Sequence, residues 1–466
     1  MPLRTSLATA ASLLVLASGL AASPAAAQSK PWTLHEAVGA PDNLKLSGSI
    51  RARYESLEGQ YRPALGDGSD QGLFLRSTLF AELDLSPVRI GGELIDARAY
   101  LNDSGSPTSV ADVNALELIQ AYVAADVKDL FVDGAKGSIT LGRFTMDLGS
   151  RRLVGRSAYG NSTNAMAGVR GAWSAKSAGS ATLFYSYLSQ RRPSDRASIL
   201  DNEIEADRHT DDLILAGAFY TAPKLADGSQ LELYGFRLEE NDSPTLATRN
   251  RQLTTLGGRV LRNPAPGKWD YEVEGAWQTG TARNSTSAAD RRDLDVDAQL
   301  LHLEVGRTFK APWSPRIALE YDFASGDESS ADGEFNRFDG LIGPRRTDFG
   351  PTSGYGPISR SNINSPGVRF EVVPNPRWDA MIFYRAMWLD EAGDSFANTG
   401  VRDATGRAGD FAGHQVEARA RYWIVPKATR LDMGLATLIN GEFLDKAPNA
   451  TGGEPLYGYF EVTQTF

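Results

Sequence analysis

Residues 411–424 read FAGHQVEARARYWI, and apolar and polar side chains alternate along this stretch. Val416 and Ala418 share one face of an extended chain, whereas Glu417 and Arg419 share the other. A face with this many charges is unsuited to packing against a protein core. The pattern therefore predicts a β-strand with lipid on one side and a water-filled lumen on the other.

The same alternation recurs along the whole chain, and about eighteen segments carry it. In 315–323, for example, Ile317 and Leu319 alternate with Glu320 and Asp322. We predict strands at 44–57, 71–85, 88–101, 114–126, 137–146, 166–175, 180–190, 211–221, 229–239, 251–261, 269–280, 297–309, 315–325, 366–373, 377–389, 411–424, 430–441 and 455–466.

The links between these segments alternate in length. Every second link is a short turn, beginning with Ser86-Pro87 and continuing with proline-containing sequences such as NPAPGK, VPNP and VPK. The intervening links are long, and the longest is 325–366. This sorting predicts an all-β fold, a transmembrane antiparallel β-barrel of about 18 strands with short periplasmic turns and long extracellular loops.

The two ends of the chain carry export features. Residues 1–27 resemble a secretory signal peptide, with Arg4, an apolar stretch and Ala25-Ala26-Ala27 before the expected cleavage point. Residues 28–43 would form a short periplasmic segment, and 44–466 the barrel. The final strand ends on Phe466, and it resembles the signal by which barrel-assembly machinery recognises its substrates. These features predict the outer membrane of a Gram-negative bacterium, after cleavage of the signal peptide, with outer-membrane lipid around the barrel.

The charged residues predict what the lumen accepts. Strand alternation places arginines and one acidic neighbour on the lumen side, namely Arg51, Arg53, Arg76, Asp96, Arg98, Arg369 and Arg385. Two loop motifs, GSRRLVGR at 149–156 and GPRRTDFG at 343–350, add Arg151, Arg152, Arg156, Arg345 and Arg346, with Arg360 close behind. Rings of arginine select anions in pores, so an anion path is expected although the chain has a net charge of −10. Alternatively, these arginines are solvated loop charges or pair with acidic residues to hold loops inside the barrel.

The two loop motifs, together with the run FDGLIGPRRTDFGPTSGYGPISRSNINSPGVR at 338–369, resemble the alginate-export family of outer-membrane porins. The resemblance extends from about Leu44 to Phe466. It implies a monomeric barrel of eighteen strands with a narrow electropositive constriction that passes polyuronate chains. Within the matching motifs it assigns the pore role to Arg151, Arg152, Arg156, Arg345, Arg346, Arg360 and Arg369. Asp96 and Arg98 lie in a less diagnostic segment, ELIDARAY at 93–100.

The expected function is an outer-membrane channel through which an anionic polysaccharide or oligosaccharide diffuses, as in the export of an alginate-like polyuronate. An uptake porin selective for acidic sugars or other small anions is the main alternative. An outer-membrane or secreted enzyme that degrades polysaccharides is a further alternative. Either the export or the uptake of an acidic saccharide is compatible with the sequence.

Residue motifs for other activities are weak. The four histidines, His35, His209, His302 and His414, show no metal-ligand spacing, so no catalytic site, metal site or cofactor is expected. An acidic run at 327–334 offers the hard oxygen ligands that Ca²⁺ prefers, through Asp327, Glu328, Asp332 and Glu334. We favour the interpretation of that run as a solvated loop. The chain is acidic and has no basic patch interleaved with aromatic residues, so no nucleic-acid partner is expected.

Overall fold

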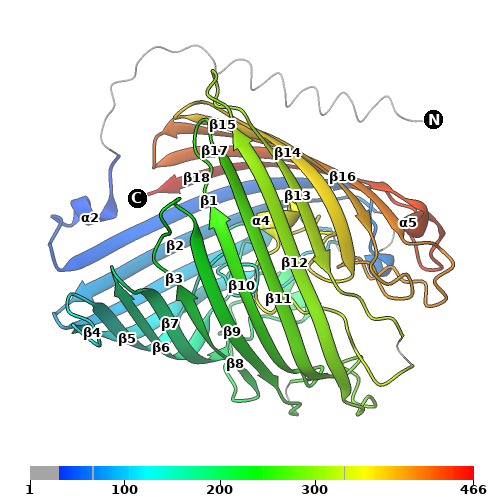
Figure 1. Cartoon of the computed structure of the whole chain (residues 1–466), viewed down its shortest axis with the longest axis horizontal. Helices are drawn as coiled ribbons and strands as arrows, with labels where there is room; N and C mark the ends of the chain where they lie inside the picture. Colours follow the sequence, from blue (N-terminus) through cyan, green and yellow to red (C-terminus); the bar gives the residue numbers. More distant parts are fainter. Residues whose placement is uncertain (1–30, 66–67, 104, 245, 330) are drawn as a thin grey trace.

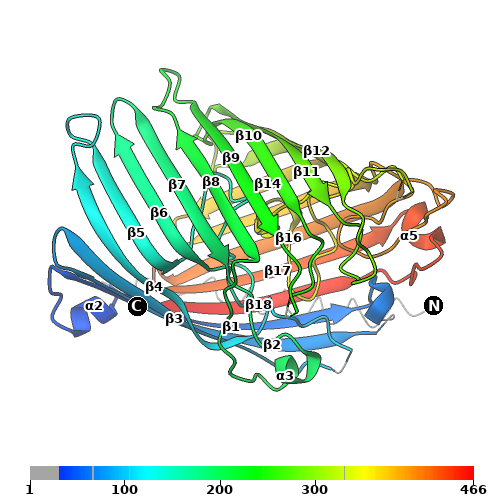
Figure 2. The same ribbon diagram turned by 90° about the horizontal axis from the view of Figure 1, so that it is seen from below.

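The computed structural model describes residues 31–65, 68–103, 105–244, 246–329 and 331–466. They form one closed sheet of 18 strands, in which each strand pairs antiparallel with its neighbours in the chain and β18 pairs with β1 (Figures 1 and 2). The all-β barrel prediction is therefore confirmed. The predicted signal peptide, 1–27, lies outside the described residues. In the described part of the chain, no helix is long and apolar enough to cross a membrane.

Each predicted strand overlaps one observed strand. The strands are β1 (Leu44–Glu58), β2 (Asp70–Asp84), β3 (Val88–Tyr100), β4 (Asn114–Lys128), β5 (Lys136–Phe144), β6 (Met166–Ala175), β7 (Gly179–Leu188), β8 (Leu213–Thr221), β9 (Gln230–Glu240), β10 (Gln252–Arg262), β11 (Trp269–Ala282), β12 (Leu294–Thr308), β13 (Arg316–Ala324), β14 (Ile363–Asn375), β15 (Trp378–Trp388), β16 (Phe411–Val425), β17 (Thr429–Asn440) and β18 (Leu456–Thr465). The short helices are α2 (Leu34–Ala37), η1 (Pro63–Leu65), α3 (Arg196–Leu200), α4 (Arg346–Phe349) and α5 (Glu442–Lys446).

The two faces of the sheet differ as the alternation predicts. On β13, Leu319 is 64% exposed and Ile317 is 46% exposed, whereas Glu320 and Asp322, which follow them on the opposite face of the strand, are at most 4% exposed. Apolar side chains therefore cover the outside of the barrel, and charged side chains point inward, where other protein atoms bury them. This is the arrangement expected of a barrel surrounded by lipid.

Link lengths are sorted between the two ends of the barrel. The shortest links at one end, such as 59–69, are longer than the longest link at the other end, 222–229. We call these the long-loop end and the short-turn end. Helix α2 and the C-terminal residue both lie at the short-turn end (Figure 1), where the rings of Trp32 and Phe466 meet edge to face with centroids 5.7 Å apart.

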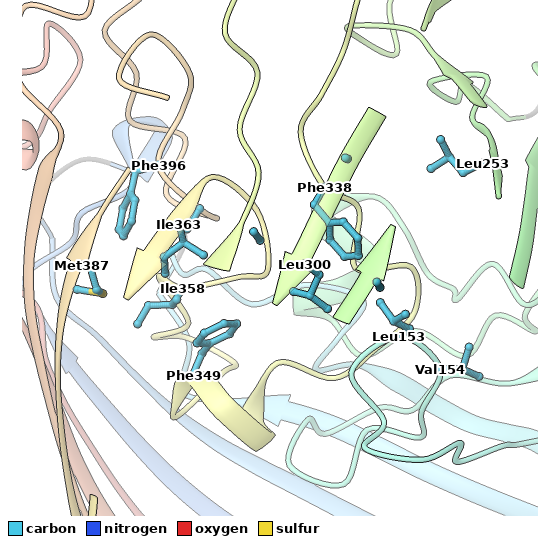
Figure 3. Close-up of a cluster of buried hydrophobic side chains, with 14 of the residues drawn as sticks. Leu153, Val154, Leu253, Leu300, Phe338, Phe349, Ile358, Ile363, Met387 and Phe396 are labelled. Carbon is cyan, nitrogen blue, oxygen red and sulfur yellow. The ribbon is translucent and has the colours of Figure 1, made fainter. Parts of the chain in front are cut away.

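Two long loops fold into the barrel and pair with each other. Val154, in the β5–β6 loop, forms a parallel bridge with Ile342, in the β13–β14 loop, and the Ile342 N–H donates to the Leu153 carbonyl at 3.1 Å. Figure 3 shows Leu153 and Phe349 from these loops among buried side chains of the strands. The lumen is thus filled at mid-height by packed loops, and its charged wall becomes buried.

The structure corrects the predicted orientation of Asp96 and Arg98. Both lie on the outer face of β3, where their side chains form an ion pair at 2.9 Å, while Ile95, Ala97 and Ala99 face inward. Folded-in loops cover the inner face at this place, because Ala99 packs in a buried cluster with residues of the loops after β3 and β7. The inner positions are therefore apolar, and the polar residues of this segment take the outer positions.

Candidate functional site

Three cavities follow one another along the lumen. The outer cavity, about 380 Å³, lies toward the long-loop end and is bordered by loop residues including Arg249, Asp339 and Arg345. The inner cavity, about 350 Å³, lies nearer the short-turn end between Tyr159 and Glu417. A basal cavity of about 390 Å³ opens beside the short turns. The inner and basal cavities share Glu371, Met381, Arg419 and Arg421, so they form a continuous series toward the short-turn end.

The backbone of 343–346 separates the outer cavity from the inner one. Gly343 and Arg345 border the outer cavity, whereas Pro344 and Arg346 border the inner cavity. Gly343 packs directly on the backbone of the β5–β6 loop, because a Cβ atom there would lie 1.8 Å from the Arg152 carbonyl oxygen. Arg345 and Arg346 are adjacent in the sequence, but they border different cavities.

Arginines and a smaller number of carboxylates line the inner cavity. Arg346 forms an ion pair with Glu417 at 2.8 Å, and Arg369 pairs with Glu320 at 2.7 Å. Arg151 also lines this cavity, and its guanidinium has no hydrogen-bond or ion-pair partner among the described residues. In the part of the chain that the structure describes, the arginines that border the inner cavity are Arg151, Arg346, Arg369, Arg419 and Arg421.

Arg419 and Arg421 share one carboxylate partner, Asp379, which uses only part of their hydrogen-bond donors. Arg421 donates to Asp379 through Nε at 2.8 Å, while Arg419 approaches the same carboxylate at 3.7 Å. Apart from these contacts with Asp379, the two guanidinium groups have no carboxylate partner among the described residues, and both arginines border the inner and basal cavities. A guanidinium with unsatisfied donors in a water-filled cavity is able to bind a carboxylate in a bidentate manner.

Arg152, next to Arg151 in the chain, has a structural role. It is 5% exposed, donates to Glu274 at 2.6 Å, and contacts Glu272 and Asp348 as well. Burial alone would raise the pKa of Asp348, but the guanidinium groups of Arg152 and Arg360 outweigh it and hold this pKa well below its usual range. The Arg152 ion pairs therefore fasten both folded-in loops to the barrel wall.

Three further predicted arginines also hold loops. Arg360 contacts Asp348 and the Pro344 carbonyl oxygen while bordering the outer cavity. Arg156 binds Glu93 through two N–H groups at 2.6 and 2.7 Å. Arg76 donates to the Gly160 carbonyl oxygen at 3.0 Å. For Arg360, Arg156 and Arg76, the structure therefore agrees with the alternative interpretation of the sequence, in which arginines hold loops inside the barrel.

The predicted set therefore divides into three groups. Arg151, Arg345, Arg346, Arg360 and Arg369 border cavities, Arg76, Arg152 and Arg156 anchor loops, and Asp96 and Arg98 lie outside the lumen. Sequence analysis missed Arg249, Arg251 and Arg337 of the outer cavity, which lie in loops without a diagnostic motif. It placed Arg419 on the inner face of a strand, and Arg421 follows from the same alternation of 411–424, but it assigned neither residue to the site.

Among the described residues, one buried group of side chains places potential metal-ligand atoms close together. His302, Glu320 and Asp322 place these atoms within 4.8 Å of one another. Arg385 already occupies the cluster, since it pairs with Glu320 at 2.8 Å and with Asp322 at 3.1 Å. A cation there would have to displace the guanidinium, so the geometry favours an ion-pair network. The acidic run at 327–334 shows no such convergence among the described residues.

Comparison with known proteins places this geometry in context. The family model described as "Alginate export" matches residues 42–457. Solved structures of similar fold include OccD3 (OpdP) of Pseudomonas aeruginosa, at 13% identity and a TM-score of 0.56 over 91% of each chain. OccAB4 of Acinetobacter baumannii has 12% identity and a TM-score of 0.57 over 91% of this chain and 98% of its own. OccK2 (OpdF) of P. aeruginosa, solved in complex with glucuronate, has 12% identity and a TM-score of 0.57 over 91% and 96%. No curated protein matches the chain in sequence.

Proposed function

The chain belongs to the alginate-export family, and from that premise we propose that it is an outer-membrane channel through which carboxylate-bearing saccharides diffuse. One observation carries this proposal. In the described residues, the guanidinium of Arg151 borders the inner cavity without a protein partner, beside Arg419 and Arg421, whose donors are only partly used. Such groups match a carboxylate in charge and in geometry.

The inner cavity supports transfer from one weak site to the next. A carboxylate held by Arg151 has Arg346 and Arg419 on the same cavity wall, and the next sugar of a chain takes the first position when it is vacated. Glu417 and Asp379 compete for these arginines, so a bound anion is released readily. Favourable but weak binding at several sites is what conduction through a pore requires.

The nature of the ligand has support from fold and from charge. OccK2 (OpdF), a barrel of the same fold, was solved with glucuronate, a sugar with one carboxylate. We propose uronate-containing oligosaccharides or polysaccharides as the ligand class for this chain also. Among the described residues that border the cavities, no nucleophile lies beside a general base, and His302 is paired with Asp322, which favours a channel over an enzyme.

The proposal also covers the membrane around the barrel, its oligomeric state and its assembly. The apolar outer face would contact outer-membrane lipid, with the long-loop end outside the cell, as in other barrels of this kind. The closed sheet pairs β18 with β1 within one chain, so the barrel needs no second copy to close, and we propose that it acts as a monomer. The final strand, with Phe466 after it, would be the address for the barrel-assembly machinery.

Ion selectivity in planar bilayers tests the proposed function. We expect the wild-type channel to prefer anions, as judged by the reversal potential in a salt gradient, and the double variant R151Q/R419Q to lose much of that preference. Both positions border the inner cavity, and neither forms a close ion pair. The variant R98Q is a control for position, because it removes a positive charge from the outer face and not from the lumen. Cation preference in the wild type, or equal selectivity in the double variant, would contradict the proposal.

A further inference from the structure

The outer cavity has a larger excess of positive charge than the inner cavity. Among the described residues, five arginines border it, and Asp339 is the only carboxylate that does so. The inner cavity also has five arginines, but Asp348, Glu371 and Glu417 border it as well. A cleft lined by charges of one sign raises the local concentration of the opposite ion. The compartment at the long-loop end is therefore the more strongly electropositive of the two.

Three of the five outer arginines are held by carboxylates. Arg251 pairs with both Glu240 and Asp339. Arg337 pairs with Asp394 at 2.6 Å and donates to the Ser395 carbonyl oxygen. Arg360 contacts Asp348. These three residues form a fixed frame, and their charges are largely compensated by the protein itself.

The remaining two, Arg249 and Arg345, have no carboxylate partner in the described part of the chain. Arg249 donates to the Asn284 carbonyl oxygen at 2.5 Å and lies over the ring of Phe335 at 4.4 Å, and Arg345 donates to the Gly356 carbonyl oxygen at 3.2 Å. Burial, and then the positive charges of neighbouring arginines, lower the pKa of both groups. Two partly buried guanidinium groups that repel their neighbours favour the entry of an anion.

Neutral donors accompany the two arginines. The hydroxyl groups of Ser359 and Ser361 lie on the same cavity wall and have no side-chain hydrogen bond to any described residue. Asn398 also borders the cavity and uses its amide N–H on the Gly356 carbonyl oxygen. Guanidinium groups beside unused hydroxyls suit a ligand that carries both carboxylates and hydroxyls, which is the chemistry of an acidic saccharide.

We propose that the outer cavity is a capture site, in which Arg249 and Arg345 bind the carboxylates of an acidic oligosaccharide arriving from the long-loop end. The inference rests on the proposed function and extends it, because it makes the two mouths of the channel unequal. With the long-loop end outside the cell, the channel loads most readily from outside, which is the arrangement suited to uptake. Diffusion through the pore remains passive, and the capture site sets the rate of loading.

Single-channel block distinguishes the two mouths. A trisaccharide of uronic acid is added to one side of the bilayer at a time, and the rate of blocking events is counted at low ionic strength. We expect the rate from the long-loop side to exceed that from the short-turn side, and R249Q/R345Q to lower only the former, by about tenfold. Maltotriose, which is neutral, and inorganic phosphate, which lacks the sugar, are compared at equal concentration and should block less often.

Matched variants separate the site from general surface charge. R291Q/R407Q removes two positive charges from exposed loops at the same end, outside the outer cavity, and should leave the blocking rate unchanged. R249K/R345K retains charge and should recover part of the rate. In the wild type, high salt should abolish the difference between the two sides, because screening weakens electrostatic capture.

Other results of these experiments would contradict either the capture site, the saccharide assignment or the proposed function. Equal wild-type rates from both sides, or an unchanged rate in R249Q/R345Q, would overturn the capture site, while the proposed function stands if R151Q/R419Q still loses anion preference. Phosphate blocking as often as the trisaccharide would overturn the saccharide assignment. If wild-type channels show neither anion preference nor block by the trisaccharide, the proposed function itself fails.

Discussion

Arg152 holds Asp348 through two parallel hydrogen bonds, from Nε and from Nη2, each 3.0 Å long, although 195 residues separate the two in the sequence. The contact joins the β5–β6 loop to the β13–β14 loop in the middle of the lumen. Two loops that border the cavities are thereby fixed relative to each other.

Loss of this pair should loosen the loops without preventing barrel closure. R152A removes the guanidinium that Glu272, Glu274 and Asp348 share. Arg360 still pairs with Asp348 and Arg259 with Glu272, so the cost is at most the about 3–5 kcal/mol of a buried carboxylate that loses its partner. We expect greater channel noise and faster proteolysis within 325–362. R151A is the control, since Arg151 has no ion pair to lose. Identical proteolysis of R152A and wild type would show that the loops are held elsewhere.

Acidification to about pH 5 should leave this fastening intact. The folded-state pKa of Asp348 is depressed below its ordinary value of 3.8, so its stabilising contribution is present above that value and is lost only as pH falls through the folded pKa. Channel noise should therefore be the same at pH 8 and pH 5. The variant D348N should be noisier than wild type at both pH values. A noise increase in wild type between pH 8 and pH 5, absent in D348N, would contradict this assignment.

Tag insertion should distinguish the two ends of the barrel. A peptide tag at 287–288, in an exposed long loop, should be accessible to antibody on intact cells, and a tag at 226–227, in a short turn, should be accessible only after permeabilisation. Both positions are exposed, so neither insertion disrupts packing. The opposite accessibility would invert the topology and with it the proposed direction of capture.

Assembly should depend on Phe466 beyond the ring contact that it makes. F466A removes the edge-to-face contact with Trp32 and also alters the expected assembly address. W32A removes the same contact but keeps the C-terminal residue. We expect F466A to reduce the amount of folded barrel, measured by its heat-dependent shift in gel mobility, much more than W32A does. Equal losses would show that the aromatic contact alone is responsible.

The strands were predictable because the residues of each strand alternate between apolar side chains on the outer face and polar side chains on the inner face. On β11, Trp269 and Val273 face outward and Glu274 inward, as the alternation requires. The prediction was wrong for Asp96 and Arg98, where the loop after β3 and the more distant loops after β5 and β7 cover the inner face of β3, whose residues there are apolar. The local sequence holds no sign of that cover.

The sequence by itself determined the closed barrel, its loop asymmetry and the richness of the lumen in arginine, because strand alternation and turn chemistry act over a few neighbouring residues. Only the tertiary structure decided which arginines are bound by the protein and which are available to an anion. Arg151 and Arg152 are adjacent, yet one borders a cavity unpaired and the other is buried among three carboxylates. That difference arises from strands and loops more than a hundred residues away, whose charges meet only after the loops have folded into the barrel.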